Sequence, residues 1–223
     1  PAITDFCFMV DQTSHMFITG PNVIKEVTGE TIDFEALGGS ETHTQTSGVA
    51  DQRYPQESDI LDHAKRWLSY VPPNNYTRAP RQKAPEATDD PSVKQALQEQ
   101  LLVLKSIIPE SPNQSYNMCE VIQAIVDPDS FWEMKPEYAG NIVTGFARLG
   151  GSSIGIVGNN PQNKAGVLDI NASIKGARFI RFCDSFNIPI ITLVDVPGFL
   201  PGSDQEKDGI IRHGAKLLYA YCE

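Results

Sequence analysis

Cysteine is scarce in this sequence. The 223 residues include four cysteines, and no two of them have the Cys-x-x-Cys spacing that is typical of zinc and redox sites. The sequence therefore predicts neither a disulfide framework nor a metal site. We interpret all four as small core residues, Cys7, Cys119, Cys183 and Cys222.

Long apolar runs are also missing. No stretch approaches the roughly 20 apolar residues that span a bilayer, and the chain does not open on a basic and then apolar leader. We therefore expect a cytoplasmic protein, or a protein of the mitochondrial matrix if the source is eukaryotic. Because the chain begins at Pro1 and ends at Glu223 inside a helical pattern, we also expect it to be a fragment.

Positive charge is in short supply. Lys and Arg total 18 against 28 Asp and Glu, which gives a formal net charge of -10 at pH 7. No block of Lys and Arg occurs of the kind that neutralises nucleic-acid phosphates. With 40% hydrophobic and 21% charged residues, the composition favours an ordinary globular protein. We expect neither nucleic acid nor a membrane among its partners.

Proline is concentrated in one region, from residue 72 to residue 91. Five prolines stand there among polar residues, Pro72, Pro73, Pro80, Pro85 and Pro91. Such a composition cannot supply a packed core and is typical of a linker. The sequence therefore predicts a domain boundary in this region.

The second half of the chain has a regular pattern. Two apolar strands at 142–148 and 153–158 flank the pair Gly150-Gly151, as in a hairpin. A helix is predicted from Ile170 to Phe186, followed by a strand at 190–194 and a further helix. The order hairpin, helix, strand, helix predicts an α/β architecture.

A bend with the sequence VDVPGFLPGSDQE follows that last strand, at residues 194–206. Pro197 and Pro201 have no amide hydrogen. Between them the chain offers three amides, those of Gly198, Phe199 and Leu200. Residues 203–206 fit a capping box, which predicts a helix start. Free amides beside a helix start could stabilise negative charge on an oxygen; a rigid strand-to-helix turn is the alternative.

The bend has one other functional interpretation. Asp195 to Gly198 read DVPG, which resembles the DxPG switch of a GTPase. That switch works together with a glycine-rich loop ending in Gly-Lys, which cradles the phosphates. Because the sequence contains no Gly-Lys pair, the GTPase hypothesis has little support.

Several longer motifs occur in a fixed order along nearly the whole chain. They are MFITGP (16–21), EALGG (35–39) with Thr42-His43, SGVA (47–50), GIVGNNP (155–161), LDINASIKGARFIRFCDSFNIP (168–189) and VDVPGFLPGSDQEKDGIIRHGAKLLYAY (194–221). In these motifs the chain resembles the carboxyltransferase β subunit of biotin-dependent acyl-CoA carboxylases, and propionyl-CoA carboxylase β chains in particular.

This resemblance implies an α/β, crotonase-like fold built of ββα units, with parts of two tandem carboxyltransferase domains. Residues 1–75 would be the C-terminal part of the first domain, 76–115 a linker and entry segment, and 116–223 the N-terminal part of the second domain. The glycine-rich turns that carry the family's best-known oxyanion holes would lie just outside both ends of this chain.

The resemblance also implies a reaction. CO2 would pass from carboxybiotin, carried on a separate domain and formed by an ATP-using subunit, to the α-carbon of propionyl-CoA or acetyl-CoA. Backbone amides can stabilise the enolate oxygen, so no metal is expected. Expected partners are the biotin carboxylase and biotin carrier subunit, the acyl-CoA, and further copies in a homo-hexamer. Two alternatives stay open: a biotin-dependent decarboxylase or transcarboxylase subunit, and a non-catalytic assembly homologue.

Candidate site residues follow from the resemblance and the bend together. The catalytic pocket wall and amide donors would be Gly198, Phe199 and Leu200, and Gly202 would allow a close approach. A loop after the second hairpin strand would line the same cavity or form a plain turn, at Gly158, Asn159, Asn160 and Pro161.

Charged and titratable side chains complete the set of candidates. Lys175 and Arg178 lie three residues apart on one helix face, where they would meet CoA phosphates or a partner subunit, or form a solvated surface. His43 and His213 are candidate general bases, because histidine as a residue type changes charge near neutral pH. The reaction that the resemblance implies does not need a histidine, so we interpret both as structural.

Overall fold

The computed structural model of this chain describes three stretches, residues 3–82, 91–111 and 113–223. Part of the predicted linker, 83–90, lies outside these described residues. Within the described stretches, none of the helices combines the length and the apolar character needed to cross a membrane.

The chain forms two compact units. Unit 1 consists of Pro1–Leu68 and Lys135–Tyr138, and unit 2 consists of Ser69–Met134 and Ala139–Glu223. Unit 1 is therefore discontinuous in sequence, because four residues of the second half of the chain belong to it. The assignment of the two halves to a first and a second carboxyltransferase domain stays a prediction.

Unit 1 contains a two-stranded parallel sheet, β1 (Phe8–Val10) and β2 (Gln52–Tyr54). Its helices are α1 (Pro21–Thr28), α2 (Phe34–Gly38) and α3 (Glu57–Leu68), with a π-helical turn at Thr42–Thr46. The helix α1 begins with a proline, whose fixed φ suits the first turn of a helix. It ends at Gly29, where a φ of 80° gives the left-handed conformation typical of helix ends.

A buried ion pair joins the two sequence segments of unit 1. The ammonium nitrogen of Lys135 lies 3.1 Å from Oδ1 of Asp51, and the two side chains are 9% and 5% exposed. Lys135 also donates to the carbonyl oxygens of Gly48 (2.6 Å) and Ala50 (3.2 Å). Asp51 in turn accepts the amide of Cys7 at 2.7 Å. Both charges are thus paired and hydrogen-bonded, which is the condition for burying them.

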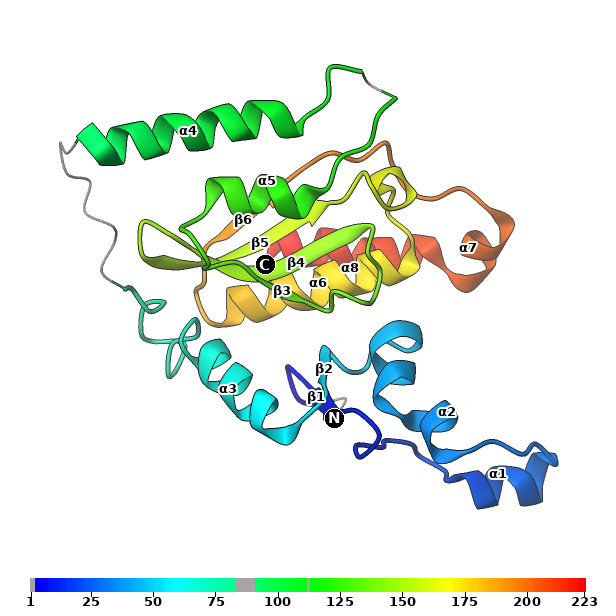
Figure 1. Cartoon of the computed structure of the whole chain (residues 1–223). Helices are drawn as coiled ribbons and strands as arrows, with labels where there is room; N and C mark the ends of the chain where they lie inside the picture. Colours follow the sequence, from blue (N-terminus) through cyan, green and yellow to red (C-terminus); the bar gives the residue numbers. More distant parts are fainter. Residues whose placement is uncertain (1–2, 83–90, 112) are drawn as a thin grey trace. The chain divides into compact units, whose positions relative to one another are not determined.

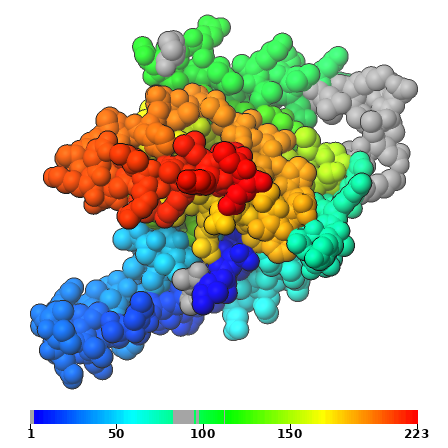
Figure 2. Space-filling model, turned by 180° about the vertical axis from the view of Figure 1, so that it is seen from behind, coloured from blue at the N-terminus to red at the C-terminus, as the bar shows by residue number. Residues whose placement is uncertain are grey.

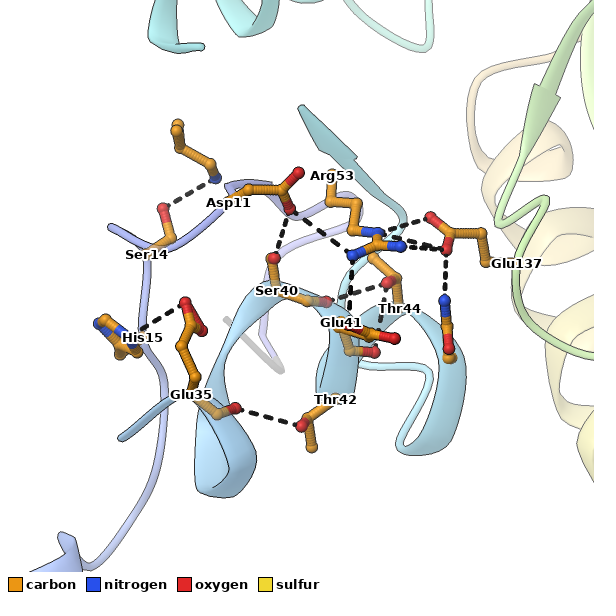
Figure 3. Close-up of polar contacts among 12 residues, drawn as sticks. Asp11, Ser14, His15, Glu35, Ser40, Glu41, Thr42, Thr44, Arg53 and Glu137 are labelled. Carbon is orange, nitrogen blue, oxygen red and sulfur yellow. Dashed lines mark hydrogen bonds and ion pairs between the residues drawn. The ribbon is translucent and has the colours of Figure 1, made fainter. Parts of the chain in front are cut away.

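A second charged network in unit 1 is centred on Arg53 (Figure 3). The guanidinium of Arg53 lies 3.0 Å from Glu137, 3.6 Å from Glu41 and 3.9 Å from Asp11. Asp11 also accepts a hydrogen bond from the hydroxyl of Ser40 at 2.6 Å. The hydrogen bond to Glu137 raises the pKa of Arg53 most, burial opposes it, and the three carboxylates raise it further. Three carboxylates around one guanidinium make this a structural network and not a phosphate site.

Unit 2 is built on a four-stranded sheet in the order β3 (Trp132–Met134), β4 (Ile142–Leu149), β5 (Ser152–Asn159) and β6 (Ile190–Leu193). The first three strands are antiparallel, and β6 is parallel to β5. The predicted hairpin, helix and strand are therefore confirmed. The helix α6 (Ile170–Ser185) intervenes between β5 and β6, ending one residue earlier than predicted.

The hairpin turn is fixed by a carboxylate. Gly150 and Gly151 both have positive φ, 57° and 76°, which favours glycine. The two oxygens of Asp127 accept their amides at 2.9 Å and 2.7 Å. This arrangement holds the register between β4 and β5.

Helices cover both faces of this sheet (Figure 1). Successive side chains of β4 point to opposite faces. Val143 and Ala147 pack with α5 (Met118–Ile125), which is joined on that side by Leu104 and Ile107 of α4 (Pro91–Ile107). Phe146 points the other way and contacts Phe179 of α6, at a ring separation of 5.1 Å. The helix α8 (Ile210–Cys222) packs on α6.

Candidate functional site

The bend that leaves β6 is pinned at its centre by Leu168. The amide of Leu168 donates to the carbonyl of Gly198 (3.0 Å), and the amide of Leu200 donates to the carbonyl of Leu168 (2.8 Å). The prediction that Leu200 offers a free amide is therefore wrong, because that amide is used within the fold.

Two of the three predicted donors remain available. In this bridge the amide of Phe199 points away from Leu168, since neighbouring residues of an extended chain direct their amides to opposite sides. Among the described residues, the amides of Gly198 and Phe199 have no hydrogen-bond acceptor. The bend thus has two free N–H groups, and that of Phe199 faces away from Leu168.

Backbone conformation explains the two glycines of the bend. Gly198 has a φ of 144° and Gly202 a φ of 154°, values that L side chains rarely adopt. A Cβ at either position would meet no atom within 4 Å. We expected Gly202 to allow a close approach, but within the described part of the chain nothing approaches it. Its conformation is what requires glycine.

The helix after the bend starts where predicted, but without the predicted cap. The helix α7 (Ser203–Asp208) has Gly202 as its N-cap, and no side chain caps it. The capping-box prediction is therefore wrong, because Ser203 is already the first helical residue. The carboxamide oxygen of Gln205 instead accepts the amide of Ile170 at 3.1 Å, which ties α7 to the start of α6. With six residues, α7 adds little dipole to the bend.

The loop after β5 lies against the start of the bend. Lys164, Ala165 and Gly166 all have left-handed backbones, with φ of 49°, 52° and 71°. A Cβ at residue 166 would lie 2.7 Å from the carbonyl oxygen of Asp195, so only glycine fits there. The loop therefore packs against the bend at Asp195, and its residue Leu168 hydrogen-bonds to the centre of the bend.

The four candidate residues in that loop hold it in place. Asn159 donates to the carbonyl of Gly166 at 3.1 Å. The side chain of Asn160 accepts a hydrogen bond from the amide of Met118 (3.2 Å) and donates one to the carbonyl oxygen of Gly140 (3.2 Å). Gly158 is buried, and a Cβ there would lie 3.0 Å from Met118. Pro161 follows as a partly exposed loop residue. These contacts support the plain-turn interpretation of the loop.

Tyr116 is a part of the site that the sequence did not reveal. Its hydroxyl donates to Oδ2 of Asp195 at 2.6 Å, across 79 residues of sequence. Burial, together with the hydrogen bond to Asp195, raises the pKa of Tyr116 to about 12. The phenol is therefore protonated and can donate at neutral pH. No local signal announces such a contact, because the two residues lie on separate segments.

The surface of the bend is open. Phe199 is 46% exposed, and the orange and red segment that contains the bend and α8 lies at the surface in Figure 2. A hollow of about 500 Å³ lies nearby, lined by Tyr116, Asn117 and Gln162 among others. Residues 198–202 do not line it, nor the second hollow described in unit 2. The bend is thus exposed at Phe199 and lies outside both of these hollows.

The predicted cationic pair does not form one surface. Lys175 is 2% exposed, with its ammonium 3.5 Å from the carbonyl of Ala139. Arg178, one turn later on α6, is exposed. The prediction that both face outward is therefore wrong, because residue 175 falls on the packed side of the helix. Only Arg178 can meet an external phosphate.

Lys175 belongs to a buried polar group that the sequence analysis missed. The thiol of Cys119 lies 3.5 Å from Oε2 of Glu133. Burial and the nearby carboxylate raise the pKa of Cys119 to about 12. Burial also raises the pKa of Glu133, and the charge of Lys175 opposes that rise. A charged residue on an otherwise apolar helix face was the available signal for this group.

The two histidines have structural surroundings. His43 places Nε2 at 2.6 Å from the carbonyl of Met16 and Nδ1 at 2.8 Å from the hydroxyl of Ser47. A carbonyl only accepts, so Nε2 carries the proton. His213 lies within α8, where burial and then its cationic neighbours lower its pKa. Among the described residues, no group of three or more His, Cys, Asp or Glu side chains could hold a metal.

Comparisons with known proteins agree on one family. The sequence matches the family described as carboxyl transferase domain over residues 1–223. It is 57% identical to the biotin-dependent acetyl-/propionyl-coenzyme A carboxylase beta5 subunit of Mycobacterium tuberculosis (strain CDC 1551 / Oshkosh), over 100% of this chain and 40% of that protein. It is 50% identical to the mitochondrial propionyl-CoA carboxylase beta chain of Homo sapiens, over 100% of this chain and 40% of that protein.

A solved structure agrees with these sequences. Transcarboxylase 12S, in a crystal structure with hydrolysed methylmalonyl-coenzyme A bound, has a TM-score of 0.90 and 47% identity to this chain. The similarity covers 99% of this chain and 42% of that one. The chain spans 40% of the length of the two curated relatives named above.

Proposed function

Because the chain belongs to the carboxyl transferase domain family, we propose that it is part of a carboxyltransferase subunit. This subunit moves CO2 from carboxybiotin to the α-carbon of a short-chain acyl-CoA, propionyl-CoA or acetyl-CoA. Its α/β, crotonase-like fold is that of the family. The names of the relatives at 57% and 50% identity support the substrate class.

The observation that carries this proposal is the free amide of Phe199, which points away from Leu168. Preorganised N–H groups stabilise negative charge on an oxygen without reorganising during the reaction. The amide of Phe199 points away from Leu168, and its residue is exposed, so it could donate to one carbonyl oxygen, such as the ureido oxygen of biotin. Carboxybiotin, when bound, supplies the carboxyl group. The chain contributes the amide of Phe199, which would hold charge on the ureido oxygen, and the ring of Phe199 would form the wall beside it.

The remaining candidates have smaller roles in this proposal. Arg178 is exposed and could pair with a CoA phosphate or an acidic partner surface. Gly158, Asn159 and Asn160 would act indirectly, by holding the loop that supports the bend. Lys175 has no external role here.

The test removes one donor without changing the side chain. In the full-length subunit, assembled with its biotin-bearing partner, residue 199 is replaced by phenyllactic acid, so that an ester oxygen stands in place of the N–H. We expect kcat for propionyl-CoA carboxylation to fall about 100-fold, the usual effect of removing one oxyanion donor. An unchanged kcat would overturn the proposal.

A matched control uses the neighbouring position. The leucic acid ester at residue 200 removes the hydrogen bond to Leu168, which is structural. We expect that variant to lose thermal stability while keeping more activity than the ester at residue 199. Equal losses of kcat in both variants would count against the special role of the Phe199 amide.

A second candidate reaction is favoured by one observation. Transcarboxylase 12S shares 47% identity and the same fold with this chain, so a transcarboxylase or decarboxylase acting on a methylmalonyl-CoA type substrate is the alternative. Assays with acetyl-, propionyl- and butyryl-CoA, with avidin blocking biotin as the control, separate the two. ATP-dependent carboxylation supports the first function, and transfer from methylmalonyl-CoA the second. No avidin-sensitive turnover would point to a non-catalytic assembly homologue.

We also propose the assembly and location that the relatives suggest. The transcarboxylase 12S structure is described as a hexamer assembly, and a homo-hexamer bound to a biotin carboxylase and biotin carrier subunit is proposed for the full-length protein. The human relative is named mitochondrial. The proposed location is the cytoplasm, or the mitochondrial matrix in a eukaryotic source.

A further inference from the structure

The bend is held near its start, at Asp195, by a side chain from elsewhere in unit 2. Tyr116, in the segment before α5, donates to the carboxylate of Asp195 at 2.6 Å. A hydrogen bond to an ionised acceptor is shorter and stronger than one between neutral groups. Asp195 stands three residues before Gly198, where the free amide pair begins. The contact thus acts on the start of the bend.

The other side of Asp195 is also supported. Its carbonyl oxygen lies against the Cα of Gly166, where no Cβ would fit. Two residues further along that loop, Leu168 bonds to the bend on both sides of Phe199. The loop therefore holds the bend from one side along its length. Tyr116 supplies the side-chain contact that fixes Asp195, near its start.

We propose that Tyr116 is a positioning residue for carboxyl transfer, which through Asp195 sets the direction of the free amide of Phe199. This inference rests on the proposed function, because it assigns to that amide the role of binding an oxyanion. Donors of this kind act only when they point at the place where charge develops. A shift of about 1 Å in the bend would weaken this donor.

The hydrogen bond does not hold the fold itself together. The phenol and the carboxylate meet at the surface of the chain, where the loss of one such bond costs little global stability. The anchors of the bend to Leu168 and of α7 to α6 through Gln205 stay in place when the phenol is removed. Positioning and folding can therefore be separated by experiment.

The central experiment is Tyr116→Phe in the full-length subunit with its biotin-bearing partner. We expect kcat to fall about tenfold, which corresponds to the loss of a charge-assisted hydrogen bond. The KM for the acyl-CoA and the melting temperature should stay close to the wild-type values. Tyr219→Phe is the matched control, since Tyr219 is 72% exposed on α8, and it should behave as wild type.

Variants of Asp195 test the mechanism of positioning. Asp195→Asn keeps an oxygen that accepts from the phenol, so it should retain kcat within about threefold of wild type. Asp195→Ala should match Tyr116→Phe, and the double variant should be no worse than either single variant. A general structural defect would instead lower the melting temperature in all of these variants, with no rescue by Asn, and would overturn the inference.

The outcome is distinguishable from failure of the proposed function. If the ester at residue 199 lowers kcat but Tyr116→Phe has wild-type kcat, the positioning role alone is wrong. If the ester at residue 199 has no effect, the oxyanion role of the bend is wrong, and the positioning role falls with it.

Discussion

The ring of Phe199 occupies the space that a side chain at residue 214 would need. A Cβ built on Gly214 would lie 2.8 Å from Cε1 and 3.0 Å from Cζ of Phe199. The ring therefore rests on the backbone of α8, and the residue that offers a free amide is also seated on a helix. Any side chain at residue 214 must move that ring, and with it the adjacent backbone.

Gly214→Ala tests this seat. Alanine favours a helix interior by about 1 kcal/mol over glycine, so we expect the melting temperature to hold or rise. Carboxyl transfer should nevertheless fall about tenfold, because the ring and the amide of Phe199 are displaced. Phe199→Ala should lower activity too, and adding Gly214→Ala to it should cause no further loss, because the ring is gone. Additive losses would show that the two residues act independently.

Gly198→Ala tests whether residue 198 requires glycine because of its backbone conformation and not because of steric crowding. No atom lies within 4 Å of a Cβ at this position, yet its φ of 144° is strained for alanine. We expect a loss of about 1–3 kcal/mol in the free energy of unfolding together with a large loss of activity. Gly29→Ala is the control, since Gly29 also has a positive φ (80°) and open space. It should lose stability but keep turnover, measured by urea unfolding and by the carboxylation assay.

Lys135→Met tests the buried ion pair of unit 1. The substitution removes the cation beside Asp51, whose side chain is 5% exposed. Breaking a buried pair by removing one partner typically costs about 3–5 kcal/mol. Lys65→Met removes an exposed pair with Asp62, also at 3.1 Å, and should cost less than about 1 kcal/mol. Similar losses in the two variants, measured by chemical denaturation, would contradict the importance of burial.

Asp169 should make the stability of unit 2 depend on pH. Burial alone would raise the pKa of Asp169, but hydrogen bonds from Lys164, the amide of Ala172 and Asn141 lower it below its usual value. A carboxyl with a lowered folded pKa stabilises the fold above its unfolded pKa, about 3.9. That contribution is lost as pH falls through the folded value.

The measurement compares the wild type with Asp169→Asn. We plot the free energy of unfolding from pH 6 down to pH 2.5 for both proteins. The difference between them should be largest above about pH 4 and should shrink as the pH falls. A difference that stays constant over this range would mean that the ionised form of Asp169 contributes nothing.

Much of unit 2 could be predicted because its signals are local. The pair Gly150-Gly151 between two apolar runs predicted the hairpin. The helix α6 begins at the predicted residue, with Asp169 as its N-cap. The prolines and glycines of residues 194–202 announced a rigid bend. Backbone conformation and apolar spacing depend on neighbouring residues, so they can be predicted from the sequence alone.

Three of the features that the sequence did not predict share one physical cause. The amide of Leu200 is engaged by Leu168, and the hydroxyl of Tyr116 reaches Asp195 across 79 residues. Lys175 and Arg178 share a helix but face different surroundings, because packing against the sheet decides which side is buried. Contacts between distant segments decide which polar groups are free, and one sequence without its fold cannot reveal them.

Because Lys135–Tyr138 belong to unit 1, they restrict which segments can be exchanged between related proteins. A gene truncated after the codon for Leu68 would encode a polypeptide without the ammonium group that faces Asp51 and without the ring of Tyr138, which lies against Gly48. A chimaera that exchanges the first 68 residues should therefore carry residues 135–138 from the same parent. A crossover between residues 68 and 135 would combine Asp51 from one parent with Lys135 from the other.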